Sequence, residues 1–177
     1  MTRQVVVIAL GANLPWQGQP PEQTLFDAAA SLKRSGLLQD LRLSQLWRSA
    51  PVNALGPEFV NAALVAESTH GAADLLALLL TTELAFGRDR TGHERPESVS
   101  PARTLDLDLI AVGDLQCQSN ELTLPHPRAT QRAFVLEPLA ELLPSFLLRD
   151  ASGHQASVAT WLSRLPSSDR SQLHPVE

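Results

Sequence analysis

The feature that most constrains this chain is a five-residue alternation, Leu-Asp-Leu-Asp-Leu, at residues 105–109. Successive side chains of a β-strand point to opposite faces, so the three leucines would share one face while Asp106 and Asp108 share the other. The segment therefore predicts a strand that buries its leucines in a core. It would present two carboxylates, roughly 7 Å apart along the strand, at the edge of that core.

Two neighbouring carboxylates need positive charge nearby, because each one raises the pKa of the other. Four arginines upstream can supply it, at Arg88, Arg90, Arg95 and Arg103. Mg²⁺ favours one or two carboxylates together with water and phosphate oxygens, and guanidinium groups grip phosphate oxygens bidentately. The stretch is therefore typical of a metal–polyphosphate site. The alternative is a solvated edge strand beside a charged loop, since an Asp-x-Asp pair is expected by chance roughly 0.5 times in such a composition.

Composition and charge exclude several classes of protein. The chain has 177 residues, 44% hydrophobic and 19% charged, as is usual for one globular domain. Its net charge of −5 argues against a nucleic-acid binder that relies on bulk positive charge. No Gly-x-x-x-x-Gly-Lys-[Ser/Thr] motif occurs, which excludes a P-loop kinase. Phosphates would have to be bound by arginine, backbone amides and metal.

The sequence contains no signal for export or membrane insertion. Its single cysteine, Cys117, fits a reducing compartment, and the apolar run at the N-terminus is too short for a signal peptide. No segment reaches the roughly 18 apolar residues of a membrane span. We expect a cytoplasmic monomer that acts on small molecules, with no nucleic-acid or membrane partner.

The remaining apolar patterns predict a mixed α/β domain. Strands are predicted at 4–10, 41–47, 59–67, 105–109, 121–124 and 146–148, and helices at 22–34, 72–86, 134–143 and 157–165. The order β-α-β-β-α-β is that of a ferredoxin-like α+β core, an antiparallel sheet flanked by helices, here with additional C-terminal elements.

Two segments are expected to lie outside this regular structure. Residues 1–165 are predicted to form one domain, while residues 166–177 are polar, lack periodicity and predict a frayed tail. Together with Met1, that tail favours a stand-alone protein. Residues 91–102 have the composition of a loop and predict a mobile lid over the metal–phosphate site.

Three polar residues stand out, each with two interpretations. Asn61, inside an apolar strand, is either a structural hydrogen-bonding residue or a reader of a polar ligand. Glu83, near the C-terminal end of its helix, is either solvated, as the helix dipole favours, or directed at the site. His126 is more often structural by residue type, but Arg128 and Arg132 nearby extend the basic lining.

Several motifs together resemble those of the 6-hydroxymethyl-7,8-dihydropterin pyrophosphokinases, a family of folate biosynthesis, from residue 5 to about residue 165. The matching motifs are Gly11-Ala12-Asn13-Leu14, Trp47-Arg48-Ser49-Ala50-Pro51-Val52, Phe59-Val60-Asn61-Ala62-Ala63, Glu83-Leu84-Ala85-Phe86-Gly87-Arg88, the 101–109 stretch, and Leu124-Pro125-His126 with Arg132-Ala133-Phe134. Their common order is more specific than any one of them.

This resemblance implies transfer of pyrophosphate from ATP to the hydroxymethyl group of the dihydropterin, giving AMP and the pterin diphosphate. It assigns two Mg²⁺ ions to Asp106 and Asp108. The implied roles are catalytic for Arg88 and Arg103, ATP-binding for Glu83, Arg90, His126 and Arg132, and pterin-binding for Ser49, Val52, Phe59, Asn61 and Phe134. Phe59 and Phe134 would sandwich the pterin ring, and Asn61 is thereby resolved towards ligand binding.

The chain departs from the family pattern at several places: the 91–102 loop looks longer than in shorter members, and Ala50 stands where Pro or Glu is often found. The 91–102 loop lacks a Trp that the family often carries there, which puts the closed contacts of the lid in doubt, and Phe59 stands where Tyr is common. Two rival functions are another Asp-x-Asp metal-dependent nucleotide transferase and a non-catalytic ferredoxin-like binding module.

Overall fold

The computed structural model describes residues 2–51, 56–88 and 102–177. Val52, Arg90, Arg95 and nearly all of the expected lid at 91–102 lie outside the described residues.

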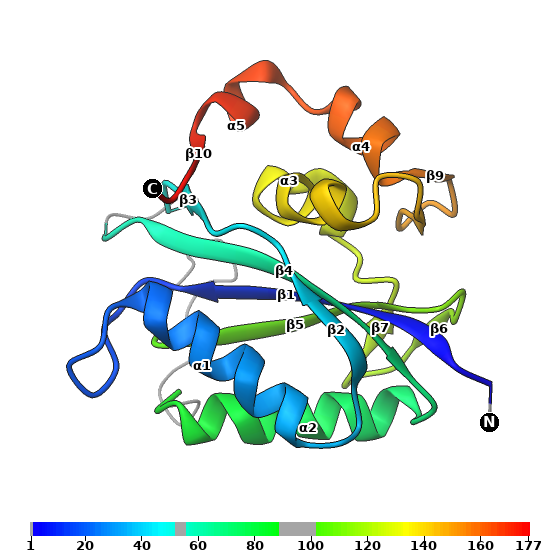
Figure 1. Ribbon diagram of the computed structural model, residues 1–177. Coiled ribbons are helices and arrows are strands. Elements are labelled where there is room, and N and C mark those ends of the chain that lie inside the picture. Colours follow the sequence, from blue (N-terminus) through cyan, green and yellow to red (C-terminus); the bar gives the residue numbers. More distant parts are fainter. Residues whose placement is uncertain (1, 52–55, 89–101) are drawn as a thin grey trace.

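A six-stranded antiparallel sheet forms the middle layer of the molecule (Figure 1). Its strands are β1 (Gln4–Ala12), β2 (Gln39–Leu43), β3 (Trp47–Ser49), β4 (Phe59–Ser68), β5 (Asp106–Val112) and β10 (Leu173–Pro175). Their order is β10-β3-β4-β1-β5, and β2 also pairs with β4. The central strands β1 and β4 pair over their full length, so the sheet is continuous behind the predicted site.

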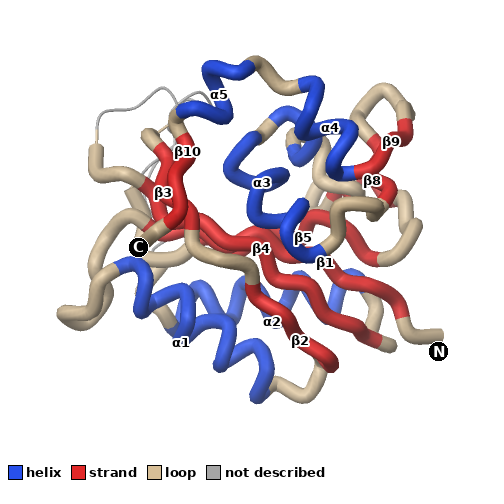
Figure 2. Tube along the Cα trace, turned by 45° about the horizontal axis from the view of Figure 1, so that its top comes forward, coloured by secondary structure: helices blue, strands red, loops and turns tan. Residues whose placement is uncertain are grey.

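Helices cover both faces of this sheet. They are α1 (Pro21–Arg34), α2 (Ala72–Ala85), α3 (Ala133–Leu142), α4 (Val158–Arg164) and α5 (Ser167–Ser171), with a 3₁₀ turn at Ala129–Gln131. In Figure 1, α1 and α2 lie below the sheet, while α3 and α4 lie above it. Two small hairpins, β6 (Cys117–Gln118) with β7 (Thr123–Leu124) and β8 (Leu147–Arg149) with β9 (Gln155–Ser157), complete the described part, and Figure 2 shows the second beside α4.

The alternation in β5 separates its leucines from its aspartates, as predicted. Leu105, Leu107 and Leu109 are buried in the core on the side of α1 and α2. Asp106 and Asp108 point to the other face and are only partly buried. The strands at 4–10 and 59–67 and the helices at 22–34 and 72–86 are also confirmed, with ends that differ by a residue or two.

A β-bulge interrupts the pairing of β5 with β1 just beyond the two aspartates. Val7 pairs with Ala111 and Ile8 with Leu109, so Ile110 is an extra residue on β5. Ile110 and Ala111 therefore both enter the core on the side of α3. The carbonyl of Ile110 accepts a hydrogen bond from the backbone N–H of His126 at 2.8 Å. The bulge thus attaches the His126 segment to the strand that carries the aspartates.

The single strand expected at 41–47 is instead two strands, β2 and β3. Between them Ser44 turns inward: its N–H donates to the Ala63 carbonyl and its hydroxyl accepts from the Ala63 N–H, both at 2.9 Å. Gln45 N–H bonds the Glu141 carboxylate on α3 at 3.0 Å. The break explains why Leu46, which is buried, departs from the alternation.

The last residues differ from the frayed tail that was expected. They form α5 and then β10, which pairs with β3 at the edge of the sheet. Val176 N–H also donates to the Leu46 carbonyl at 2.8 Å. Backbone pairing of this kind does not require side-chain periodicity, which is why the sequence pattern missed it. No helix in the described part of the chain combines the length and apolar composition needed to cross a membrane.

Candidate active site

The site lies on the α3 side of the sheet, where three strands meet in one row. Gly11 of β1 is directly opposite Asn61 of β4 on one side and Asp106 of β5 on the other. Residues directly opposite in an antiparallel pair share a face. A methyl group on Gly11 would lie 3.6 Å from Asn61 Oδ1 and 3.9 Å from Asp106 Cβ. Because Gly11 has no side chain, the space between the Asn61 amide and the Asp106 carboxylate is open above its backbone.

Asp106 is surrounded by arginines from the end of α2 and from just before β5. Arg88 Nη1 pairs with Oδ1 of Asp106, and Arg103 Nη1 lies 2.7 Å from Oδ2. Burial opposes ionisation of Asp106, but the charges of Arg103 and Arg88 outweigh that effect and hold its pKa below the usual value of an aspartate. Asp106 is therefore ionised over the whole neutral range.

Glu83 extends this cluster into the protein interior. Its side chain has no exposed surface, pairs with Arg88, and accepts a hydrogen bond from the backbone N–H of Leu107 at 2.8 Å. The interpretation of Glu83 as a solvated residue is thus wrong, and the alternative, a carboxylate directed at the site, is right. The strand backbone and the guanidinium stabilise the anion at a helix end that would otherwise disfavour it.

Asp108 has a different environment although it is two residues away. Its nearest described cation is Arg132, with Nη1 3.7 Å from Oδ2 of Asp108. Burial and the negative charge of Asp106 raise the pKa of Asp108 to about 6, and the arginines reduce this effect without cancelling it. Among the residues that the structure describes, the Asp108 end of the pair therefore has less compensating positive charge than the Asp106 end.

His126 lies beside this end of the site, partly buried. Its Nδ1 accepts a hydrogen bond from the Arg128 backbone N–H at 3.2 Å. Burial, with the charges of Arg132 and Arg128, lowers the pKa of His126 to about 4. The imidazole is consequently neutral near pH 7. The structure brings His126 and Arg132 together with the aspartates, as the sequence predicted.

Each aspartate has an arginine that also contacts an aromatic ring. Arg103, which pairs with Asp106, lies over Phe59 with its guanidinium carbon 6.0 Å from the ring centroid. Arg132, near Asp108, lies over Phe134 at 5.4 Å. Cations held over ring faces in this way are attracted by the ring quadrupole. The two rings come from β4 and α3, so one apolar surface lies at each end of the carboxylate pair.

Asn61 is held in a fixed orientation within the row. Its Nδ2 donates to the Ser49 hydroxyl at 2.9 Å and to the Trp47 carbonyl at 3.3 Å. Asn61 and Ser49 are both buried. These donations leave Oδ1 of Asn61 facing the position above Gly11. The Ser49 hydroxyl thus orients the side-chain amide of Asn61.

Asn13 is a residue of this region whose contacts no sequence pattern predicted. Its Oδ1 accepts from the Arg103 N–H at 2.7 Å, and the N–H groups of Asn13 and Leu14 donate to the Arg103 carbonyl at 3.0 and 3.2 Å. Asn13 Nδ2 also donates to the Pro57 carbonyl at 3.2 Å. Its position after a buried strand, within the Gly11-Ala12-Asn13-Leu14 motif, was the signal that could have identified it.

The donor set fits a divalent metal that also binds a phosphate ligand. Asp106 and Asp108 share a face, and burial together with the negative charge of Asp106 raises the pKa of Asp108. Within residues 2–51, 56–88 and 102–177, no group of three His, Cys, Asp or Glu side chains comes together as a metal site. Mg²⁺ with two carboxylates completes its shell with water and phosphate oxygens, so a phosphate-bearing ligand would have to contribute.

The sequence of this chain matches one protein family over most of its length. A profile of the family described as 7,8-dihydro-6-hydroxymethylpterin-pyrophosphokinase (HPPK) matches residues 7–144. A 2-amino-4-hydroxy-6-hydroxymethyldihydropteridine pyrophosphokinase of Pseudomonas aeruginosa is 37% identical over 150 residues, covering 83% of this chain and 85% of that protein. The enzyme of the same name from Synechocystis is 36% identical, covering 80% of this chain and 67% of its own.

Longer relatives also match. A mitochondrial folate synthesis bifunctional protein of Arabidopsis thaliana is 35% identical over 89% of this chain, which spans 27% of that protein. Among solved structures, an HPPK-DHPS in complex with substrates superimposes with a TM-score of 0.65 at 9% identity, covering 92% of this chain and 43% of that one. A Plasmodium falciparum HPPK-DHPS gives a TM-score of 0.62 at 12% identity, covering 91% of this chain and 43% of that one. At such identities the superpositions show a shared fold.

Proposed function

The chain belongs to the 7,8-dihydro-6-hydroxymethylpterin-pyrophosphokinase family, and from this we propose that it transfers pyrophosphate from ATP to 6-hydroxymethyl-7,8-dihydropterin. The hydroxymethyl oxygen would attack the β-phosphorus of ATP while the bond from that phosphorus to the α,β-bridging oxygen breaks. The products are AMP and the pterin diphosphate, an intermediate of folate biosynthesis.

The observation that carries this proposal is the arrangement around β5. Two carboxylates share one face of the strand, and arginines from the end of α2, the approach to β5 and the start of α3 surround them. Bound Mg²⁺, as two ions at Asp106 and Asp108, would neutralise charge on the phosphates and orient the attacking hydroxyl. The two rival functions explain neither the flanking rings of Phe59 and Phe134 nor the fixed amide of Asn61.

We assign the arginines to the phosphates. Arg88 and Arg103 would move part of their contacts from Asp106 to the transferring group once cations occupy the carboxylates, since a guanidinium binds either anion bidentately. Arg132 and neutral His126 would line the nucleotide phosphates. Arg90, outside the described residues, would bind ATP as well.

For Glu83 we propose a role that differs from direct ATP binding. Its side chain is fully buried and contacts Arg88 and the Leu107 backbone. It would therefore act on ATP through Arg88, by setting the position and charge of that guanidinium.

The pterin would bind over the row that contains Gly11. Phe59 and Phe134 provide apolar rings suited to stacking on a flat heterocycle. Asn61 Oδ1, oriented by Ser49, would accept a hydrogen bond from the pterin edge, and Gly11 would leave room for the ring. Val52, outside the described residues, would contribute backbone groups.

The strand order supports a further interpretation of the fold. Read without β10, the order β3-β4-β1-β5 with the two crossover helices α1 and α2 on one face corresponds to a ferredoxin-like core. In this interpretation, α3 to α5 and the two small hairpins are additions that cover the opposite face. We propose that residues 1–165 act as one catalytic domain, to whose sheet β10 adds an edge strand.

The experiment that tests this function is an assay for AMP with ATP, Mg²⁺ and the hydroxymethyl dihydropterin. We expect AMP formation that depends on the pterin and on Mg²⁺, and that falls at least about a thousandfold in Asp106→Ala. Circular dichroism establishes that the variant is folded. Pterin-independent AMP release, or undiminished activity in Asp106→Ala, would reject the proposed reaction or the metal site respectively.

A further inference from the structure

The connection from β1 to α1 contains a closed turn that the proposed function does not yet use. Trp16 N–H donates to the Gln19 carbonyl at 3.0 Å, and Gln19 N–H donates back to the Trp16 carbonyl at 2.9 Å. The two residues between them have positive φ, 48° at Gln17 and 79° at Gly18. This is the geometry of a type I′ turn, which fixes the direction of the residues that flank it. The two hydrogen bonds with Gln19 therefore fix the backbone position of Trp16.

The indole of Trp16 lies directly against Gly87. A Cβ atom added to Gly87 would lie 2.0 Å from Cζ3, 2.3 Å from Cη2 and 2.5 Å from Cε3 of that ring. These separations are far below any contact distance between carbon atoms, so the ring occupies the space where a side chain would be. Among the glycines in the described part of the chain, Gly87 alone has a neighbour this close. Its φ of +76° independently favours glycine.

Gly87 lies two residues beyond the end of α2 and directly precedes Arg88, which turns towards the site. Its N–H donates to the Leu84 carbonyl at 3.0 Å, and the Arg88 N–H donates to the Glu83 carbonyl at 3.0 Å. This pair of bonds is a Schellman motif, in which glycine takes the left-handed position. The motif aims the Arg88 guanidinium at Glu83 and Asp106. Trp16 therefore packs on the bend that determines where Arg88 points.

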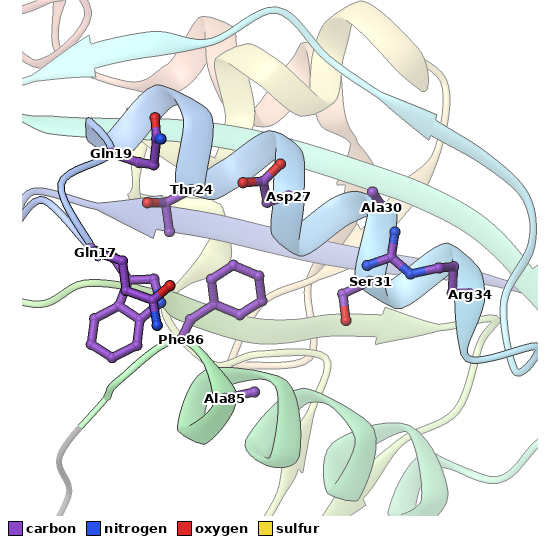
Figure 3. Close-up of a pocket in the computed structure, with 10 residues that line it drawn as sticks. Gln17, Gln19, Thr24, Asp27, Ala30, Ser31, Arg34, Ala85 and Phe86 are labelled. Atoms are coloured by element: carbon purple, nitrogen blue, oxygen red, sulfur yellow. The ribbon is translucent and has the colours of Figure 1, made fainter.

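An open pocket of about 400 Å³ between α1 and the end of α2 borders the same indole. It is lined by Trp16 and Phe86 and by polar residues of α1, and Figure 3 shows Ala85, the last residue of α2, and the following Phe86 across from Asp27 and Ser31 of α1. A small side chain at position 16 would join this pocket to the surface of Gly87. The bend would then lose the packing that restricts its motion.

We propose that Trp16 is a positioning residue for the transfer reaction, because its indole packs against Gly87 and so holds Arg88 in line with Asp106. The proposal rests on the proposed function and adds a residue that acts through Gly87 and Arg88. The β1–α1 turn would thus support phosphate binding indirectly, by holding the arginine that contacts the phosphate.

The test compares the steady-state kinetics of Trp16→Ala and Trp16→Phe with those of the wild type. Misplacement by about 1 Å can cost up to about a hundredfold in rate, so we expect kcat/KM for ATP to fall about tenfold in Trp16→Ala. The KM for the pterin should stay within about twofold, and Trp16→Phe, which keeps a flat ring, should retain most of the activity. Trp161→Phe is the matched control. Trp161 of α4 is buried and donates to the carbonyl of Leu148 in β8, away from Arg88.

A double-mutant cycle with Gly87→Ala isolates the contact itself. In the wild-type background Gly87→Ala has two costs: its methyl group clashes with the indole, and alanine is forced into a positive φ. In the Trp16→Ala background the clash is absent, and only the cost of the positive φ persists. We expect Gly87→Ala to lower kcat/KM for ATP less in the second background. Equal effects in both backgrounds, or Trp16→Ala kinetics that match those of Trp161→Phe, would overturn the positioning role. A wild type without pterin-dependent AMP would instead overturn the proposed function.

Discussion

Asp106 and Asp108 are separated by one residue, yet they belong to two different electrostatic regions. Asp106 is part of a network that runs from buried Glu83 through Arg88 to Arg103, and its pKa is lowered. Asp108 has Arg132 at 3.7 Å and the repulsion of Asp106, and its pKa is raised to about 6. One end of the carboxylate pair is thus built to be stable without ligands, while the other is left with charge that a cation can compensate. The difference predicts that, without metal, the charge of Asp106 stabilises the fold while the charge of Asp108 opposes it.

The largest effect should come from breaking the Asp106 network at its buried end. Glu83→Ala leaves the Leu107 N–H without its carboxylate acceptor and removes the fully buried partner of the Arg88 guanidinium, which among the described residues keeps only Asp106 and the Leu105 carbonyl. Removing one member of a buried ion pair typically costs about 3–5 kcal/mol. We expect the free energy of unfolding to fall by about 3 kcal/mol, measured by urea denaturation without nucleotide or metal. Arg132→Ala is the control at the Asp108 end and should cost less than about 1 kcal/mol. Equal losses in the two variants would show that the two regions are energetically alike.

Replacing each aspartate by asparagine should change the free energy of unfolding in opposite directions. In EDTA at pH 7.5, Asp106→Asn should lower the free energy of unfolding by about 2 kcal/mol, because it removes the anion that pairs with Arg88 and Arg103. Asp108→Asn should raise it by about 0.5 kcal/mol, because it removes a charge that burial and Asp106 disfavour, an effect reduced by the partial exposure of Asp108. Chemical denaturation of both variants measures the two signs. Destabilisation of the protein by Asp108→Asn would contradict the assignment.

The smallest of the three effects concerns pH, where Asp108 and His126 should act in opposite directions. Asp108 has a folded pKa of about 6 against about 3.9 when unfolded, so the folded state binds more protons and stability falls as pH rises from 4 to 6. His126 has a folded pKa of about 4 against about 6.5 when unfolded, so stability rises with pH over the same window.

Single variants should separate these two contributions. Relative to wild type, Asp108→Asn should make the slope of stability against pH more positive between pH 4.5 and 6.5, and His126→Gln should make it more negative, each by less than about 1 kcal/mol over the window. Urea denaturation at four pH values gives the slopes. Parallel curves for both variants and the wild type would mean that neither pKa is shifted on folding.

The parts of the fold that follow side-chain periodicity could be predicted from the sequence. The two faces of β5 and the helices α1 and α2 are examples, because burying one apolar face determines the period of the pattern. The separation of β2 from β3 could not be predicted, because it depends on Ser44 bonding to Ala63 of another strand. The pairing of β10 with β3 involves backbone groups that leave no pattern in the side chains.

The site was predictable where residue type alone indicates chemistry, and less so where tertiary contacts do. Asp106, Asp108, Arg88 and Arg103 were identified from their charges and spacing, and the structure brings them together. Glu83 was misjudged without the family motif, because its environment depends on the Leu107 N–H from a distant strand. The contact of Trp16 with Gly87 carries no signal in the sequence, since a tryptophan in a Pro- and Gly-rich loop resembles an ordinary loop residue.

The bulge at Ile110 means that residue count, and not residue type alone, decides which way β5 presents its side chains. Before the bulge the odd-numbered positions face α1 and α2, whereas beyond it the even-numbered Val112 does so. The strand thus changes phase once, and the carbonyl at the change of phase is the one that holds the His126 segment. Substitution of Ile110 by another apolar residue should cost little stability. Losing or gaining one residue there would invert the faces of the strand on one side of the change and detach His126 from the aspartates.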